Sequence, residues 1–562
     1  MTSETRFNIP TTSRTILLAR GFHLTIVRNV VKTNYYRDSL QLLHLSEEAK
    51  KIEGVNDAAV VMATSTNKEI LSRLKLLTSE GQGASSSDLI IAVSADLESA
   101  IDNGVHRIEN SLNQPLATST GHFHTVEAAL QSLPDANLAI VSVPGEHARP
   151  LVTSLLERGL NVHLFSDHVS QQDEFELKRL AKSKGLLVMG PGAGTSIIAG
   201  KAIAFANVVR KGNVGIVAAA GTGLQEVSVL ISEGGIGVSQ ALGTGGGDVK
   251  GPIGGITTLQ AIEALERDTA TNVIVIVSKP PDLTVKKKII EYANQSTSKP
   301  VVTCFLGAEL SADTAANGTR ISLTRTLHAA ALETLRRVSP SAIFDSISIS
   351  PGELFAVVNE IRKGLKTEQR YVRGLYTGGT LAYEALVILN QLIGGVYSNA
   401  PLNSKYKLPN SSESLNDSIL DLGEEEFTLG RAHPMIDPTV RQLRLIQEAR
   451  ESAVSVIIMD IMLGYGSHSD PAGAMCDSIF KAQTIAKNDD RVLPILAHVC
   501  GTDQDPQRRS DQIERLRKVG VKIFPTNALM VTASALISRR DITLARLNEF
   551  YNHFLYGSPG VA

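Results

Sequence analysis

The sequence has few cysteines, no long apolar run and almost no net charge, and each shortage excludes a class of protein. Its cysteines, Cys304, Cys476 and Cys500, are far apart and odd in number, which argues against a disulfide framework and CxxC metal sites. The 55 Lys and Arg residues balance 57 Asp and Glu residues, so no broad basic surface is expected to attract nucleic acid or anionic lipid. No apolar run approaches the roughly 20 residues that cross a bilayer, and the polar N-terminus lacks the apolar core of a signal peptide. We therefore expect a cytoplasmic protein that acts on small anionic ligands and has neither nucleic-acid nor membrane partners.

The pattern along the chain predicts several α/β domains. From residue 117 onward, short Val- and Ile-rich runs that end in Gly or Pro alternate with longer helical stretches, as in βαβ units of a parallel sheet. We expect several doubly wound parallel sheets, Rossmann-like or flavodoxin-like, behind a small α+β N-terminal domain. The expected boundaries are a disordered tail over 1–13, the α+β domain over 14–115, doubly wound domains over 116–212, 213–373 and 431–562, and a helix with a polar linker over 374–430.

Three glycine-rich turns lie where predicted strands lead into helices, which is where open parallel sheets bind ligands. Unpaired N–H groups and the positive end of a helix dipole attract anions there, and glycine lets a ligand approach the backbone. The turn "GTGGGDVKGPIGG" (243–255) has seven glycines in thirteen positions but matches neither the dinucleotide nor the Walker pattern. Ordinary tight turns remain an alternative for each. The phosphate-binding candidates in these turns are Gly221, Thr222, Gly223, Gly245, Gly246, Gly247, Asp248, Lys250, Gly464, Gly466 and Ser467.

Other candidates come from polar residues near strand ends. In "GRAHPMIDPTVR" (430–441) the arginines and the acid form either a structural salt bridge or a clamp for a carboxylate or phosphate. His433 and His468 are candidates for proton transfer, although His468 also suits a cap on the neighbouring helix. Cys500 is more readily explained as a buried cysteine than as a nucleophile. No metal site is predicted. The remaining substrate-binding candidates are Thr377, Gly378, Gly379, Arg431, Asp437, Arg441 and Thr502.

The order of these segments resembles a known family. "GNVGIVAAAGTGLQEV", "ALGTGGGDVKGPIGG" and "KPVVTCFLG" are similar to the alpha subunit of succinyl-CoA synthetase, and "SVIIMDIMLGYGSHSDPAGAM" and "LPILAHVCGTDQDPQ" to the ligase domain of its beta subunit. Together with "GRAHPMIDPTVR", they resemble the FdrA family of acyl-CoA synthetase-like proteins, over roughly residues 117–535. The resemblance implies a CoA-binding domain first, with Thr120, Gly121 and His122 at its nucleotide-binding turn.

Departures from that family change the expected reaction. The "GHAGA" segment with its phosphorylated histidine is missing, His328 lies in a helical pattern without flanking glycines, and "SKPPD" replaces the acidic "GEIGG" turn. The chain also has no room for an ATP-grasp domain of about 200 residues. The FdrA family is associated with oxamate carbamoyltransferase. The resemblance therefore implies a carbamoyltransferase subunit that interconverts oxalurate plus phosphate with oxamate plus carbamoyl phosphate in allantoin breakdown, together with other subunits.

Two alternatives remain at this stage. The first is an acyl-CoA synthetase subunit, which handles acyl-CoA and receives its nucleotide chemistry from another chain. The second is a non-catalytic scaffold that senses anions, which a loose resemblance of the N-terminal domain to ACT-like sensors favours. The need for CoA or Mg²⁺ as a cofactor stays open, because glycine turns bind phosphate with or without a metal.

Overall fold

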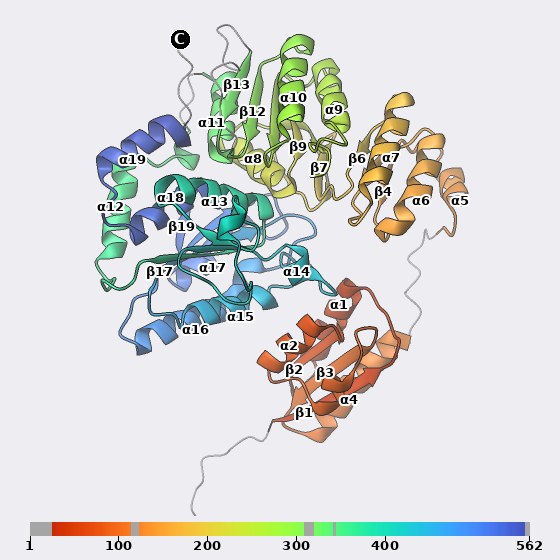
Figure 1. Cartoon of the computed structure of the whole chain (residues 1–562). Coiled ribbons are helices and arrows are strands. Elements are labelled where there is room, and N and C mark those ends of the chain that lie inside the picture. The colour runs from red at the N-terminus through yellow and green to blue at the C-terminus, as the bar shows by residue number, and fades with distance from the viewer. Residues whose placement is uncertain (1–24, 114–122, 308–319, 341–343, 557–562) are drawn as a thin grey trace, which may run out of the picture. The chain divides into compact units, whose positions relative to one another are not determined.

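The computed structural model describes residues 25–113, 123–307, 320–340 and 344–556. The chain forms two compact units, one of residues 1–119 with 429–431 and one of residues 120–428 with 432–562 (Figure 1). No helix in the described ranges is both long and apolar enough to cross a membrane. The tail expected over 1–13 lies outside the described residues, so its predicted disorder stays a prediction.

The first unit is the small α+β domain that the sequence predicts. Its antiparallel sheet has the order β1-β3-β2. Strand β3 is buried at all seven positions because it is the middle strand. Helices α1 and α4 contribute buried apolar residues to the core with all three strands. The elements are β1 (Ile26–Lys32), α1 (Ser39–Lys50), β2 (Val55–Met62), α2 (Ser65–Arg73), α3 (Ser79–Gly83), β3 (Leu89–Ala95) and α4 (Glu98–Asn113).

The second unit begins with a small parallel sheet in the order β4-β5-β6, covered by α6 and α7 (Figure 1). Its core consists mainly of Val and Leu side chains from β4, β5, α6 and α7. This is the position at which a Rossmann-like domain is predicted. The elements are α5 (Val126–Ser132), β4 (Leu138–Val141), α6 (Gly145–Glu157), β5 (Asn161–Leu164), α7 (Gln171–Ser183) and β6 (Val188–Met189).

A seven-stranded sheet follows in the order β13-β12-β11-β9-β10-β7-β8. Its strands from β9 to β13 are parallel, while the β7-β8 hairpin joins β10 antiparallel. The hairpin falls inside the range predicted for the preceding domain, so the boundary expected at 212 lies too late. The elements are β7 (Thr195–Ile198), β8 (Lys201–Ala204), β9 (Lys211–Ala219), α8 (Gly221–Glu233), β10 (Val238–Gly243), α9 (Ile256–Arg267), β11 (Val273–Ser278), α10 (Leu283–Ser296), β12 (Val301–Phe305), β13 (Ile321–Thr324), α11 (Leu327–Val338) and α12 (Pro351–Arg362).

The last sheet is parallel, in the order β15-β16-β14-β17-β18-β19. The segment 374–430, expected to be a helix with a linker, contains the helix α13 (Gly379–Leu392) and also supplies half of β14 and all of β15 and β16. The strands β15 and β16 were not predicted because they are only two and four residues long within polar sequence. The elements are β14 (Tyr371–Tyr376), α13 (Gly379–Leu392), β15 (Tyr397–Ser398), β16 (Ser418–Asp421), α14 (Glu425–Thr428), α15 (Thr439–Glu448), β17 (Val454–Met462), α16 (Pro471–Asn488), β18 (Ile495–Cys500), α17 (Arg509–Lys518), β19 (Lys522–Phe524), α18 (Asn527–Ser538) and α19 (Leu544–Phe550).

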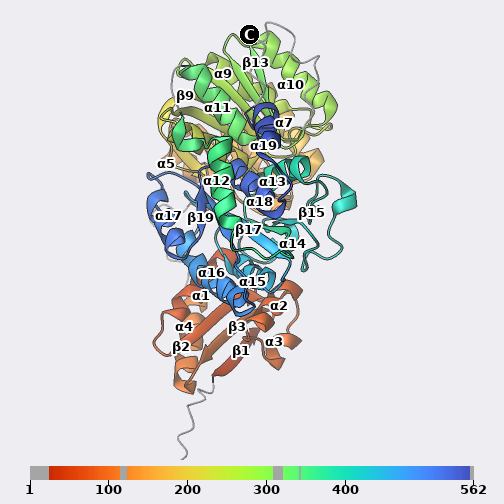
Figure 2. The same ribbon diagram turned by 90° about the vertical axis from the view of Figure 1, so that its left-hand side faces the viewer.

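One apolar core joins the two large sheets. Helices α8 and α11 of the seven-stranded sheet pack with α13 and α18 of the six-stranded sheet, and their buried residues form a single cluster. Helix α12 packs against α18 and α19 (Figures 1 and 2). This packing places the helix that follows β9 beside the helix that follows β14, which positions the site described below.

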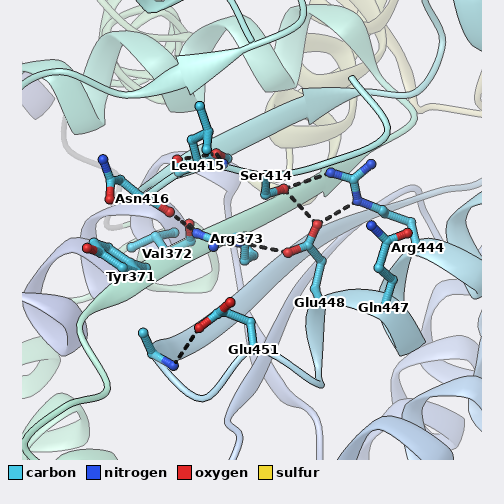
Figure 3. A network of polar contacts seen from close by, with 12 residues as sticks. Tyr371, Val372, Arg373, Ser414, Leu415, Asn416, Arg444, Gln447, Glu448 and Glu451 are labelled. Atoms are coloured by element: carbon cyan, nitrogen blue, oxygen red, sulfur yellow. Dashed lines mark hydrogen bonds and ion pairs between the residues drawn. The ribbon is translucent and has the colours of Figure 1, made fainter. Parts of the chain in front are cut away.

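A buried ion network supports the six-stranded sheet (Figure 3). The carboxylate of Glu448 accepts hydrogen bonds from Nε of Arg373 at 2.8 Å, Nε of Arg444 at 2.5 Å and the hydroxyl of Ser414 at 2.6 Å. Burial alone would raise the pKa of Glu448, but the two arginines lower it overall. The network ties α15 to β14 and to the loop before β16.

Candidate functional site

The N-termini of α8 and α13 meet within the second unit. The backbone N–H of Thr380 donates to the hydroxyl of Thr222 at 3.0 Å. A Cβ atom on Gly378 would lie 3.3 Å from Cβ of Thr222, and one on Gly223 would lie 2.9 Å from Cγ2 of Thr380. Glycine at these positions is what allows the close approach. Two turns that the sequence predicted separately therefore form one site.

Free backbone donors remain at this junction. Among the described residues, no hydrogen-bond acceptor is found for the N–H groups of Gly221, Thr222 and Gly223. Neither helix carries a side-chain cap from its own N-cap residue, and Gly221 is exposed. Because the positive ends of two helix dipoles converge here, a bound anion is stabilised by both. The arrangement suits a phosphoryl group or a developing oxyanion.

Asp460 lies in β17, and its side chain reaches the turn before α13. Its carboxylate accepts the N–H groups of Thr377 at 2.8 Å and Gly378 at 2.6 Å, and it pairs with Arg441 at 3.1 Å. Burial raises the pKa of Asp460, and Arg441 opposes that shift. Arg441 was expected to clamp a substrate, but only 3% of its side chain is exposed and it faces Asp460, so the salt-bridge alternative describes its geometry. Sequence reasoning missed Asp460, although an acid within the apolar run "VIIMDIM" was its signal.

Three further groups surround the first turn of α13. Asp421 ends β16, and its Oδ2 atom would lie 2.5 Å from a Cβ placed on Gly379. A Cβ on Gly423 would lie 2.7 Å from Nε2 of His433 and 3.2 Å from Oδ1 of Asp421. Lys279 follows β11, and its Nζ atom lies 5.6 Å from the ring centroid of Tyr383 on α13. A lysine, an acid and a histidine therefore lie near the start of α13.

His433 is neutral in this setting. Burial lowers its pKa to about 4, and its Nδ1 atom accepts the N–H of Met435 at 3.2 Å. The proton of the neutral ring therefore belongs on Nε2, the atom that lies near Gly423. In this state Nε2 of His433 can donate a hydrogen bond. The proton-transfer role expected from the sequence is thereby limited to a neutral ring near pH 7.

The acid in the middle of the turn "GTGGGDVKGPIGG" has a structural role. Asp248 is fully buried, accepts the N–H groups of Thr257 at 3.0 Å and Thr258 at 2.8 Å, and pairs with Lys178 at 2.9 Å. It therefore caps α9 and ties α7 to it, so the phosphate role expected of Asp248 is corrected. Gly245 and Gly247 pack against Pro191 and Glu174, whereas Gly246 and Lys250 are exposed.

We expect Asp248→Asn to lower the free energy of unfolding by about 2 kcal/mol, because it weakens charged hydrogen bonds to the α9 N-terminus and to Lys178. The same variant should bind phosphate as tightly as the wild type. Urea unfolding and calorimetry with inorganic phosphate measure the two effects. A large loss of phosphate affinity without a loss of stability would restore the ligand role.

The third glycine turn packs against the connection after β8. A Cβ on Gly464 would lie 2.6 Å from the carbonyl oxygen of Ala206, and the hydroxyl of Thr502 donates to the carbonyl of Val208 at 2.6 Å. Nδ1 of His468 accepts the N–H of Asp470 at 2.9 Å, whereas the cap of α16 is the side chain of Asp470 itself, which accepts the N–H of Gly473. These contacts stabilise the turn, and the proton-transfer role expected of His468 stays a prediction.

The other predicted residues have the following contacts. Gly466 packs on the ring of Phe205, and the Ser467 hydroxyl is buried with no partner among the described residues. Asp437 accepts the N–H and hydroxyl of Thr439 at the start of α15. Arg431 groups with the first unit rather than with the domain predicted to start there. The predicted CoA-binding residues Thr120, Gly121 and His122 lie outside the described residues.

A buried cluster of Glu226, His498 and Cys500 lies deeper between the two sheets. Nε2 of His498 and Oε2 of Glu226 are 2.7 Å apart, a hydrogen-bond distance that is shorter than the roughly 3.3 Å between two ligands of one tetrahedral zinc ion. Cys500 is fully buried, and burial raises the pKa of its thiol well above the ordinary value. Glu226 and His498 are joined by a hydrogen bond here, and burial favours the protonated thiol of Cys500.

Two family profiles match the chain. The CoA-ligase profile matches residues 375–537, which cover most of the six-stranded sheet, and a profile described as "AllF, heavy metal-associated domain" matches residues 25–128. Soft heavy metals are held mainly by thiolates, and residues 25–128 contain no cysteine. The residues of this chain therefore do not fit a thiolate metal site in that domain.

Individual relatives agree with the CoA-ligase match. The chain is 42% identical over 524 residues to the uncharacterized protein YahF of Escherichia coli, a match that covers 92% of this chain and 98% of YahF. It is 25% identical to the ADP-forming sulfoacetate-CoA ligase subunit SauD of Bilophila wadsworthia, over 43% of this chain and 80% of SauD. It is 26% identical to the alpha subunit of an ADP-forming succinate–CoA ligase of Staphylococcus epidermidis, over 33% of this chain and 61% of that subunit. The chain belongs to the family of YahF, whose members share a succinyl-CoA synthetase-like scaffold.

Proposed function

We propose that the chain is a subunit of an acyl-transfer enzyme of the acid–thiol ligase class, and that it holds an acyl phosphate between the N-termini of α8 and α13. The observation that carries the proposal is the meeting of two helix N-termini with the N–H groups of Gly221, Thr222 and Gly223 left free. Two relatives named as subunits of CoA ligases support the same class.

In this proposal the free N–H groups bind the phosphoryl oxygens and the oxyanion that forms when a thiol attacks the acyl carbon. A single preorganised donor of this kind contributes about 10²–10³ to a rate. Lys279 adds positive charge beside α13 and suits the carboxylate or phosphate of the substrate. Attack by the thiol of CoA would form the thioester and release phosphate.

The acyl phosphate arrives already formed. His328, the sole histidine between residues 305 and 340, lies inside α11 with a side chain that is 1% exposed. Burial lowers its pKa to about 3, and neither ring nitrogen has a partner among the described residues. A buried histidine in this position is not accessible to a nucleotide, so the proposal has the activated acyl group supplied from outside this chain.

A second candidate reaction is carbamoyl transfer, as in oxamate carbamoyltransferase. The buried position of His328 favours it, because carbamoyl phosphate is an acyl phosphate that needs no phosphohistidine. The facing helices would hold its phosphoryl group, and Lys279 would hold the carboxylate of oxamate. Both candidates use the same site and differ in the nucleophile, a thiol or an amide nitrogen.

Phosphate release separates the candidates. The purified chain, alone and with its natural partner subunits, is incubated with acetyl phosphate plus CoA or with carbamoyl phosphate plus oxamate. We expect release in one arm that depends on the nucleophile. No turnover in either arm by the full complex, together with phosphate-dependent stabilisation, would contradict catalysis and favour an anion-sensing scaffold. Transfer of label from ATP to a histidine would contradict the preformed acyl phosphate.

A further inference from the structure

We propose that Asp421 is the acid–base residue of this site, which takes the proton of the attacking nucleophile and passes it to the departing phosphate. The inference rests on the proposed function and adds a residue that the sequence did not single out. Asp421 ends β16 beside Tyr376, the last residue of β14, so its side chain starts at the sheet edge from which α13 begins.

The backbone of Asp421 is held firmly. Its N–H donates to Oδ1 of Asn399 at 2.9 Å, and its carbonyl accepts from Nδ2 of the same residue at 2.9 Å. Oδ1 of its carboxylate accepts the N–H of Gly423 at 3.0 Å. Oδ2 lies against Gly379, the first residue of α13, and has no hydrogen-bond partner among the described residues. One oxygen is thus anchored, and the other lies unpaired beside the first residue of α13.

Asp421 is not needed as a cap for helix α13. Asp460 already accepts the N–H groups of Thr377 and Gly378, and Thr222 accepts that of Thr380. Asp421 is 4% exposed, and a carboxyl group buried to this extent without a full set of donors costs free energy. Such groups gather where an enzyme needs an acid or a base.

The charges around Asp421 set its proton affinity. Burial raises the pKa of Asp421 to about 7, the positive charge of Lys279 lowers it, and Glu424 and Asp460 raise it. Asp460 is paired with Arg441, and His433 is neutral near pH 7 because its pKa is about 4. Asp421 therefore carries a proton below about pH 7 and is a carboxylate above it, which suits proton transfer near neutral pH.

In the proposed step one bond forms, one bond breaks and one proton moves. The nucleophile, a thiol S–H or an amide N–H, forms a bond to the acyl carbon, and the C–O bond to the phosphoryl group breaks. The proton of the nucleophile moves to Oδ2 of Asp421 and then to the released phosphate, which leaves the carboxylate ready for the next turnover. No oxidant or further co-reactant is needed.

The test uses the full complex in the phosphate-release assay. We expect Asp421→Asn, which keeps the size of the side chain, to lower kcat at least a hundredfold while inorganic phosphate binds within twofold of the wild type. The wild type should lose activity as the pH falls below about 7. Lys279→Met should move that loss to higher pH, because the charge that lowers the pKa of Asp421 is gone, whereas Glu424→Gln should move it to lower pH.

The role of Asp421 would be overturned by an Asp421→Asn variant that keeps its rate, or by Lys279→Met and Glu424→Gln variants with the wild-type pH profile. Either result would leave the proposed function standing. A wild-type complex that releases no phosphate would overturn both this inference and the proposed function. Exposed Asp503, whose carboxylate accepts the N–H of Ser510, provides the matched control, and Asp503→Asn should change neither kcat nor the profile.

Discussion

Replacing Gly379 by alanine is expected to lower turnover about a hundredfold while the chain stays folded. The added Cβ would lie 2.5 Å from Oδ2 of Asp421, a distance that real Cβ atoms do not tolerate. The carboxylate must move away from the first turn of α13, and displacements of about 1 Å at reacting groups cost about 10² in rate. Alanine suits the first turn of a helix, so the change strains the site and not the helix itself.

Gly352 offers the control for this variant. It also lies in the first turn of a helix, α12, but an added Cβ there would meet no atom within 4 Å. Gly352→Ala should therefore keep full turnover. Steady-state kinetics of phosphate release and thermal melting of both variants make the comparison. Equal rates for the two variants would show that the surroundings of Gly379 are not part of the reaction.

Glu448→Ala is expected to have the largest effect on stability, about 3–5 kcal/mol. The substitution leaves the buried guanidinium groups of Arg373 and Arg444 without their shared carboxylate (Figure 3). Both side chains are at most 5% exposed, so bulk water does not solvate the charges that lose their partner. Urea unfolding followed by circular dichroism measures the change.

Glu360 is the matched control, because it also pairs with a cation, Lys363, but its side chain is 71% exposed. Glu360→Ala should leave the unfolding midpoint within error, since exposed ion pairs contribute little. A small loss for Glu448→Ala, similar to that of the control, would mean that the two arginines find other partners or water.

The long central strands could be predicted from sequence, whereas the short strands β15 and β16 could not. Strands β9, β11 and β17 lie inside sheets that are covered on both faces, so they form continuous Val- and Ile-rich runs. Strands β15 and β16 are short and lie among Ser, Asn and Pro residues, so their sequence resembles a linker. Strand β16 is fixed by its long-range pairing with β14, and β15 by its pairing with β16.

The candidate site was predicted in pieces. The glycines before α8 and α13 indicate strand-to-helix turns, but their meeting depends on Thr222 and Thr380, which are 158 positions apart. For Asp248 the sequence was misleading. An acid among glycines was expected to be accessible to a ligand, but it is buried against Lys178. Local pattern predicts that a turn exists, whereas its partner is set by how the two sheets pack.

The most direct test of the central claim is a crystal structure of the chain grown with inorganic phosphate. We expect a phosphate between α8 and α13, with its oxygens within about 3 Å of the N–H groups of Gly221, Thr222 and Gly223. Phosphate bound elsewhere, with these N–H groups hydrogen-bonded to water alone, would contradict that claim.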